Sequence, residues 1–165
     1  MRLRSVVPAG LLSAAVSIAF AADDASSAYP ADAYATCAAC HLPDGAGIPG
    51  AFPPIRNRAA TIASLDGGRA YLATVVSYGL MGTINVAGSQ YFGVMAGNVG
   101  AMSPEDIAAA LNYVIFELND ADAIDLEPYT AEEVAEAQAA VSTKSPAAGG
   151  DVRSRLVDDH GDEWP

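Results

Sequence analysis

Apolar side chains recur at helical spacing in several segments of the chain, and the clearest of these covers residues 104–118. Ser103 stands at the N-cap position, and Pro104 occupies the first helical position, where its missing N–H costs nothing. Asp106 stands where a capping box has Glu or Gln. The pattern therefore predicts a helix that begins at Pro104.

Two shorter segments have the same period. Residues 33–40 follow Asp32, a favourable N-cap residue, and residues 68–78 carry an apolar stripe that ends at Gly79. We expect a helix over each of them. Residues 43–54, by contrast, are rich in glycine and proline and predict a loop.

The second half of the chain contains three further regions. Residues 80–101 are rich in glycine and predict irregular structure. Residues 131–141 predict another helix, with Thr130 as its N-cap and Glu133 completing a capping box. The composition of residues 143–165, rich in Pro, Ala, Gly and Asp, predicts a flexible acidic tail. The predicted fold is therefore all-α.

The N-terminus has the composition of a secretory signal peptide. Arg2 and Arg4 form a basic start, residues 6–20 carry no charge, and Ala19-Phe20-Ala21 matches a small-x-small cleavage site. The uncharged run is short for a membrane span of about 20 residues. We therefore expect residues 1–21 to be removed on export and the mature chain to reside in a bacterial periplasm.

The charge of the chain is unevenly distributed. Loss of the signal peptide removes two arginines, so the net charge falls from -12 to -14. Residues 22–100 hold five acids and three arginines, a net charge of -2, whereas residues 101–165 hold fifteen acids and three bases, a net charge of -12. This surface argues against nucleic-acid binding. The acidic half either keeps the protein soluble or also steers a basic partner.

One motif at the end of the first predicted helix carries chemistry, namely Cys37-Ala38-Ala39-Cys40-His41. A C-x-x-C-H run is typical of c-type haem attachment, in which each cysteine forms a thioether and the histidine binds the iron. A structural zinc site would need four ligands, yet the only other histidine is His160. A thioredoxin-like motif would need a strand before it, and a plain disulfide leaves His41 without a role. We therefore predict one covalent haem c.

With this motif the sequence resembles the class I, mitochondrial-type monohaem cytochromes c, over residues 34–118. The residues that carry the resemblance are the haem motif, Gly45-Ala46-Gly47-Ile48-Pro49-Gly50, Phe52-Pro53-Pro54-Ile55, Tyr91-Phe92-Gly93-Val94-Met95 and the final helix at 107–114. The resemblance implies a small helical fold packed around one haem.

The resemblance also implies a division of the chain. Residues 32–120 form the cytochrome c domain, after a leader at residues 22–31. An acidic connector and extra helix follow at residues 121–142, and the flexible tail comes last.

Two site residues come from the resemblance. In the family, a proline carbonyl after the haem motif accepts a hydrogen bond from the axial histidine, and Pro53 matches that position. A methionine from a late loop is the sixth iron ligand, and Met95 matches it, although the proline that follows this methionine in the family is absent. Met81 and Met102 are the other candidates.

Two further charged features bear on ligands. Arg69 is a candidate partner for a haem propionate, because guanidinium groups bind carboxylates in a bidentate manner. The acids from Asp120 to Glu127 suggest calcium, but an EF-hand loop counted from Asp120 needs Gly at place six and Glu at place twelve, where the chain has Asp125 and Ala131. We expect no calcium site.

These features predict an electron-transfer protein and not an enzyme, with an iron that cycles between its ferrous and ferric states. It would serve as a diffusing carrier to an oxidase or reductase, or as the cytochrome subunit or acceptor of a periplasmic dehydrogenase, since residues 127–136 resemble an extension found in such cytochromes. The alternative is a haem enzyme or ligand sensor with an open iron site, such as a small peroxidase. The sequence offers no distal histidine for that alternative.

Overall fold

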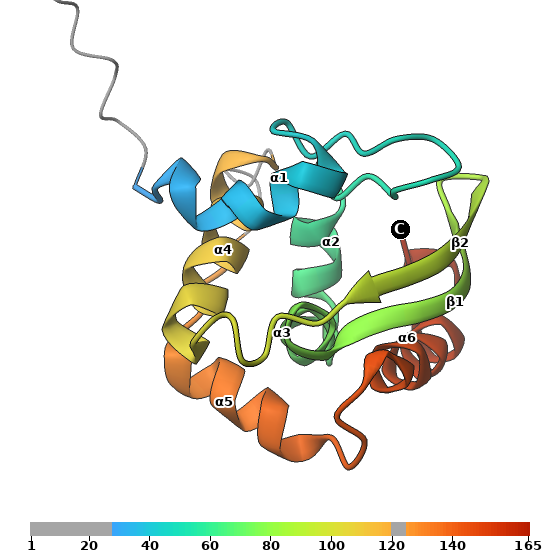
Figure 1. The fold of residues 1–165 in the computed structure, drawn as a ribbon. Helices are drawn as coiled ribbons and strands as arrows, with labels where there is room; N and C mark the ends of the chain where they lie inside the picture. The colour runs from blue at the N-terminus through green and yellow to red at the C-terminus, as the bar shows by residue number, and fades with distance from the viewer. Residues whose placement is uncertain (1–27, 120–124) are drawn as a thin grey trace, which may run out of the picture.

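The computed structural model describes residues 28–119 and 125–165, and helices make up most of this part of the chain (Figure 1). The elements in chain order are η1 (Ala31–Tyr34), α1 (Ala35–His41), α2 (Ala59–Ser64), α3 (Gly68–Tyr78), β1 (Gly79–Val86), β2 (Ser89–Ala96), α4 (Pro104–Glu117), α5 (Ala131–Ala140), α6 (Pro146–His160) and η3 (Gly161–Glu163). The predicted signal peptide and most of the predicted leader lie outside the described residues. Among the described helices, none is long and apolar enough to cross a bilayer.

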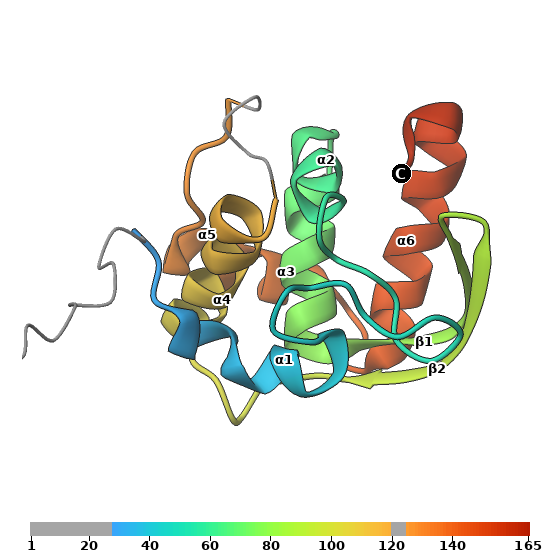
Figure 2. The ribbon, with the colours of Figure 1, turned by 90° about the horizontal axis from the view of Figure 1, so that it is seen from above.

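The helices are arranged in three layers (Figure 2). Helices α2 and α3 lie between α4 and α5 on one side and α6 on the other. The larger core cluster joins the layer of α4 and α5 to the layer of α2 and α3. Within it, Ile107, Leu111 and Ile115 of α4 pack with the buried Tyr34 of η1. A smaller cluster under α6 contains Leu156 and residues of α2 and α3. The site described below lies between these two clusters.

The structure confirms the strongest helix predictions. Helix α3 spans the predicted residues, and α4 begins at Pro104 with Ser103 as its N-cap. Ser103 and Asp106 bond each other reciprocally, so the short aspartate completes the capping box. Thr130 is the N-cap residue of α5, as expected, and its hydroxyl accepts from the N–H of Glu133. The Glu133 carboxylate, however, bonds Arg69 and not the N-cap backbone, so only half of that capping box forms.

The first predicted helix differs in its start. It divides into η1 and α1, and α1 extends one residue further than expected, to His41. Asp32 lies inside η1 and caps neither piece, because Pro30 and Tyr34 occupy the N-cap positions. Helix α2, which follows the predicted loop, was not expected from the sequence.

The prediction of irregular structure over residues 80–101 is wrong for most of that segment. Strands β1 and β2 pair as an antiparallel hairpin, and Ala87 and Gly88 form its two-residue turn. Both turn residues have positive φ, 49° and 76°, as a type I′ turn requires. Most side chains of both strands are exposed, so the sequence lacks the alternation that marks a half-buried strand. The all-α prediction therefore holds only in part: the fold is mainly helical with a small sheet.

The predicted flexible tail contains helix α6, which packs against α3 and β1. The Pro-, Ala-, Gly- and Asp-rich composition of the segment predicts flexibility, and the glycines at positions 149 and 150 also disfavour a helix by propensity. Packing reverses this preference. A Cβ on Gly149 would lie 2.2 Å from the carbonyl oxygen of Gly79, so glycine allows α6 to approach β1 closely. Trp164, expected in that tail, instead contacts the ring of Tyr71, with a centroid separation of 5.5 Å.

Candidate functional site

The haem motif lies in the last turn of α1. Cys37 and Cys40 are three residues apart and therefore share a face of this short helix. Both are free thiols in the structure, Cys37 half-buried and Cys40 exposed. His41, the last residue of α1, is only 8% exposed. Helix α1 therefore places two thiols and an imidazole close to one another.

A backbone carbonyl orients His41. Its Nδ1 lies 2.9 Å from the carbonyl oxygen of Pro53. Because a carbonyl oxygen only accepts hydrogen bonds, Nδ1 carries the proton and Nε2 keeps a free lone pair. Burial lowers the pKa of His41, and the bond to Pro53 opposes this only in part. The ring is therefore neutral at pH 7, which is the form that binds a metal.

The loop between these two residues depends on a glycine. The N–H of Gly47 donates to the carbonyl oxygen of His41 at 2.9 Å, and its φ is +66°. A Cβ at this position would lie 2.4 Å from the carbonyl oxygen of Phe52 and 2.7 Å from that of Pro53. Gly47 thus allows the chain to pass directly behind the carbonyl that orients the imidazole.

An apolar pocket opens beside His41. The space between its lining residues, counted together with the solvent-open mouth, amounts to about 840 Å³. Cys37, His41 and Pro53 form part of its wall. Most of the remaining wall is aliphatic and comes from the loop before α2 and from α2, α3 and α4, through Ile55, Ile62, Leu72, Val75, Val76, Leu111 and Val114.

The hairpin supplies another part of the wall, including Met95. In the strand register Leu80 pairs with Met95, and both line the pocket. Met81 pairs with Val94 one position along, so both point to the other face of the hairpin. Their exposed fractions, 48% and 67%, agree with this.

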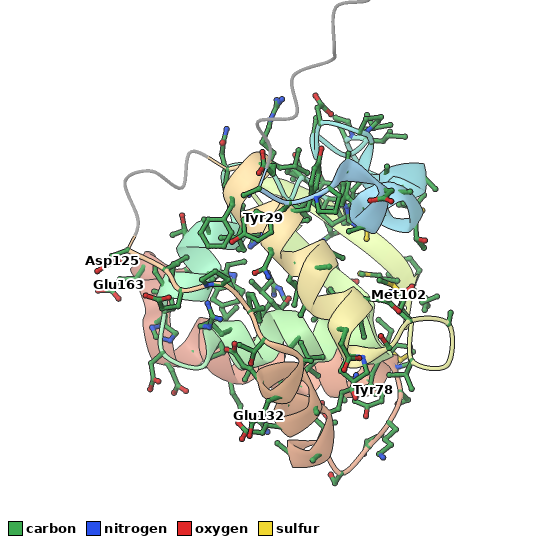
Figure 3. All side chains as sticks on the ribbon, turned by 90° about the vertical axis from the view of Figure 1, so that its left-hand side faces the viewer. Tyr29, Tyr78, Met102, Asp125, Glu132 and Glu163 are labelled. Atoms are coloured by element: carbon green, nitrogen blue, oxygen red, sulfur yellow. The ribbon has the colours of Figure 1, made fainter. Side chains whose placement is uncertain are left out.

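The third candidate methionine lies elsewhere. Met102 sits in the loop before α4 and packs against the larger core cluster (Figure 3). Of the three candidates, the structure therefore brings only Met95 to the pocket that contains His41.

A sequence profile of the cytochrome c family matches residues 27–115, more than half of the chain. The chain belongs to the cytochrome c family. It is 47% identical over 102 residues to cytochrome c-552 of Thermus thermophilus, which covers 61% of this chain and 77% of that protein. It is equally identical, over the same length, to cytochrome c-552 of T. thermophilus strain ATCC 27634 / DSM 579, of which the alignment covers 68%. The predicted class I monohaem cytochrome c is thereby confirmed.

Membership of this family means that the cytochrome c binds one covalent haem c and uses it in electron transfer. The pocket suits that group. Its walls are apolar, with Cys37 and His41 together on one side. Arg58 also lines the pocket, and its Nε and the indole N–H of the neighbouring Trp164 are buried without any partner among the described residues. Such unpaired donors suit a ligand with a polar periphery.

The structure does not bring Arg69 to the pocket of this cytochrome c. Its Nε and Nη2 each lie 2.6 Å from a carboxylate oxygen of Glu133, and its guanidinium lies 4.0 Å from the ring centroid of Tyr129. The hydrogen bonds to Glu133 are the main cause that raises the pKa of Arg69. Arg69 therefore joins α3 to α5, and this geometry gives no support to its predicted propionate contact.

Two other arginines line the pocket, and the sequence reasoning missed both. Arg58 is the N-cap residue of α2, and Arg153 lies on α6. Arg153 fell within the predicted flexible tail. The available signal was Ser145 followed by Pro146, an N-cap and first-position pair that marks the start of a helix.

Proposed function

We propose that this cytochrome c is a periplasmic one-electron carrier, with its haem attached through Cys37 and Cys40 and its iron held between His41 and Met95. One observation carries the proposal. The bond from Nδ1 of His41 to Pro53 leaves Nε2 free in a pocket to which the hairpin contributes a thioether sulfur. A neutral imidazole and a thioether are the axial pair of electron-transfer cytochromes c.

The residues around the proposed haem have separate roles. When bound, the haem supplies an iron that gains or loses one electron. Pro53 fixes the ring orientation of His41 and increases its basicity as a ligand. Met95, as a soft ligand, favours the ferrous state and raises the potential. The aliphatic wall excludes water and lowers the local dielectric, which also favours the less charged ferrous centre.

An open iron site, as in a small peroxidase, has less support. It would require a vacant sixth position and acid–base groups facing it. Met95 lies at the pocket wall, and among the described residues the wall contains no carboxylate and no second histidine. We therefore favour a six-coordinate carrier over a haem enzyme or ligand sensor.

The geometry also favours a diffusing carrier over a dehydrogenase subunit. The dehydrogenase version depends on residues 127–136, and much of this segment is engaged within the fold. Tyr129 is 4% exposed, and its backbone N–H donates to the side chain of Asn112 at 2.7 Å. Glu133 is paired with Arg69. Co-purification from a native extract tests this choice, since a stable complex with a dehydrogenase would contradict it.

Haem attachment and export are tested together by mass spectrometry. In an export-competent host, we expect the periplasmic fraction to contain a chain without residues 1–21 that retains one haem after acid–acetone extraction. Replacing both Cys37 and Cys40 by Ala should abolish this retention. A chain lacking residues 2–20 should stay in the cytoplasm without covalent haem. Haem that extracts from the wild-type protein would contradict the proposed attachment, and a cytoplasmic wild-type chain would contradict the proposed location.

A further inference from the structure

The pocket contains two cations, and no acidic side chain of the described residues neutralises them. Arg58 and Arg153 come from segments far apart in the sequence, and both line the pocket. The ion pairs among the described residues are Arg56 with Asp44 and Arg69 with Glu133, so neither pocket arginine has an Asp or Glu partner there. Burial and the nearby charge of Arg153 lower the pKa of Arg58. An anion between the two guanidinium groups would relieve both effects.

The same place holds hydrogen-bond donors without acceptors. The guanidinium carbons of Arg58 and Arg153 lie 6.0 Å and 5.6 Å from the ring centroid of Trp164, so the indole lies close to both cations. The Nε of Arg58 and the Nε1 of Trp164 are buried, and neither has a hydrogen-bond partner in the part of the chain that the structure describes. Buried donors nearly always have a partner in native proteins, so these point to a missing acceptor.

Only part of each arginine is satisfied by the protein. Arg58 donates from Nη2 to the backbone oxygen of Pro165 at 2.5 Å, and Arg153 donates from Nη2 to that of Asn85 at 3.0 Å. These bonds hold the two side chains in position and leave further guanidinium N–H groups for an anionic ligand. The acceptor that would complete the set is a carboxylate, since guanidinium groups bind its two oxygens with matching geometry.

We propose that Arg58, Arg153 and the indole N–H of Trp164 form a carboxylate site that holds a haem propionate and thereby ties α6 to the haem. The proposal rests on the proposed seat of the haem in this pocket. A haem carries two carboxylates at one edge, and these are the only arginines among the described pocket residues. Helix α6 lies beyond residues 27–115, which match the family profile.

The consequence is that this propionate stays ionised at ordinary pH. A carboxyl group in an apolar crevice has a raised pKa, and each adjacent arginine lowers it by about one to three units. The other titratable groups around the site are Tyr71, Tyr91, His41 and Cys37. In the proposed holoprotein the Cys37 thiol is converted to a thioether and no longer titrates. Burial raises the pKa of Tyr71, so it stays neutral, and in the proposed holoprotein His41 is bound to iron. Between about pH 5 and pH 8, the propionate is then the group whose ionisation depends on the two arginines.

Spectroelectrochemical titration of the holoprotein from about pH 5 to pH 8 tests the site. We expect the wild-type reduction potential to be nearly independent of pH. In Arg153→Gln the propionate pKa should rise by about one to three units into this range. The potential should then fall as pH rises, because an ionised propionate favours the ferric state. Arg153→Lys, which keeps the charge, should restore most of the wild-type behaviour.

Two matched controls and one milder variant make the test specific. Arg155→Gln removes the same charge from an exposed position of α6, and Arg69→Gln removes the arginine first predicted for this role. Both should titrate like the wild type. Trp164→Phe removes the N–H together with one ring of the indole and keeps an aromatic ring beside Tyr71, so it should give a smaller shift in the same direction, even if Arg153→Gln fails to fold.

The outcomes separate this site from the proposed function. Wild-type titration in both Arg153→Gln and Trp164→Phe, or a new titration in Arg69→Gln, would overturn the carboxylate site. Each variant is first checked for covalent haem and for the optical band of methionine-ligated iron. If the wild-type protein lacks either one, the proposed function has failed, and the carboxylate site is rejected together with the haem seat on which it rests.

Discussion

The orientation of His41 depends on the backbone at Gly47. The carbonyl of Pro53 reaches His41 only because no side chain stands behind it. A Cβ at Gly47 would meet that carbonyl at 2.7 Å and would also have to adopt a φ of +66°. Position 50 has a similar backbone conformation, with φ of +76°, but open space around it. Substitution of each glycine by alanine therefore separates the cost of backbone strain, present at both positions, from the cost of steric conflict, present only at Gly47.

We expect Gly47→Ala to destabilise the holoprotein more than Gly50→Ala. Gly50→Ala should cost about 1–2 kcal/mol in the free energy of unfolding, the penalty for a left-handed alanine. Gly47→Ala should cost about 1–3 kcal/mol beyond that, because the added methyl group displaces neighbouring backbone. Guanidinium denaturation followed by circular dichroism measures both. NMR spectra of the reduced holoproteins should show shifted ring-proton resonances of His41 in Gly47→Ala alone. Equal losses in the two variants would contradict the role given to Gly47.

Single residues also show how far the sequence predicts the site. Cys37, Cys40 and His41 were identified from their spacing alone, because thioether attachment needs local geometry within one helical turn. Pro53 and Met95 were placed by resemblance to the family. The contacts of the arginines could not be predicted from the sequence, because a guanidinium pairs with whichever anion the tertiary fold brings near it.

A polar cluster around Arg69 helps to join helices α3 and α5. Arg69 of α3 bonds both carboxylate oxygens of Glu133 on α5, and Tyr129 donates from its hydroxyl to the carbonyl oxygen of Arg69 at 3.2 Å. The side chains of the ion pair are 24% and 31% exposed, so solvent screens it only in part. This cluster attaches α5, which lies outside the matched family profile, to the core.

We expect Glu133→Gln to lower the free energy of unfolding by about 1 kcal/mol, because it removes a bidentate charged contact at a half-exposed position. Its control is Glu132→Gln, which changes the same charge on the exposed face of α5 (Figure 3). That control should change stability by less than about 0.5 kcal/mol. Thermal unfolding at low and high salt measures both. A loss in Glu132→Gln as large as that in Glu133→Gln would indicate a general charge effect and not this ion pair.

The hairpin and α6 show why some elements escaped prediction. Their sequences carry weak local signals, and each is stabilised by the other. Helix α6 packs on β1 through Gly149, which a propensity argument counts against a helix. The predicted helices α3 and α4, by contrast, carry their own apolar stripes and end signals. Local sequence therefore predicted elements with strong internal patterns and missed those that depend on tertiary contacts.

The two adjacent glycines of α6 provide a test of that contact. Gly149→Ala should destabilise the protein by about 1–3 kcal/mol, because its Cβ would lie 2.2 Å from the carbonyl oxygen of Gly79. Gly150→Ala should stabilise it by about 0.5–1 kcal/mol, since its Cβ meets only the carbonyl oxygen of Met81, at 3.4 Å, and alanine favours a helix. Denaturation midpoints measure the difference. Stabilisation by both substitutions would contradict the close approach of α6 to β1.

At the scale of the whole molecule, the negative charge lies mainly in the second half of the chain. Residues 101–165 carry a net charge of -12, whereas residues 22–100 carry -2. Part of this acidic excess is used within the fold, as at Glu133 and Asp106. Glu132 and Glu136 are exposed on α5 and remain available to a partner. Asp120 and Asp122, which belong to the acidic run first tested against a calcium loop, lie outside the described residues.

If this charge steers redox partners, electron-transfer rates should depend on salt with opposite signs for oppositely charged small probes. The oxidation rate of the reduced protein by a cationic cobalt complex should fall as the screening length shortens from about 10 Å at 0.1 M to about 3 Å at 1 M salt. The rate with ferricyanide should rise. The double variant with Gln at positions 132 and 136 should weaken both trends. A rate independent of salt for both probes would leave solubility as the role of these acids.

The central claim is that His41 and Met95 are the two axial ligands of the iron. The far-red absorption of the oxidised holoprotein tests this claim most directly. The wild-type protein should show the weak charge-transfer band of methionine-ligated ferric iron. Met95→Ala should lose the band and bind added imidazole tightly. Met81→Ala should keep it, because strand alternation places that side chain on the outer face of the hairpin. Loss of the band in Met81→Ala with its retention in Met95→Ala would contradict the account.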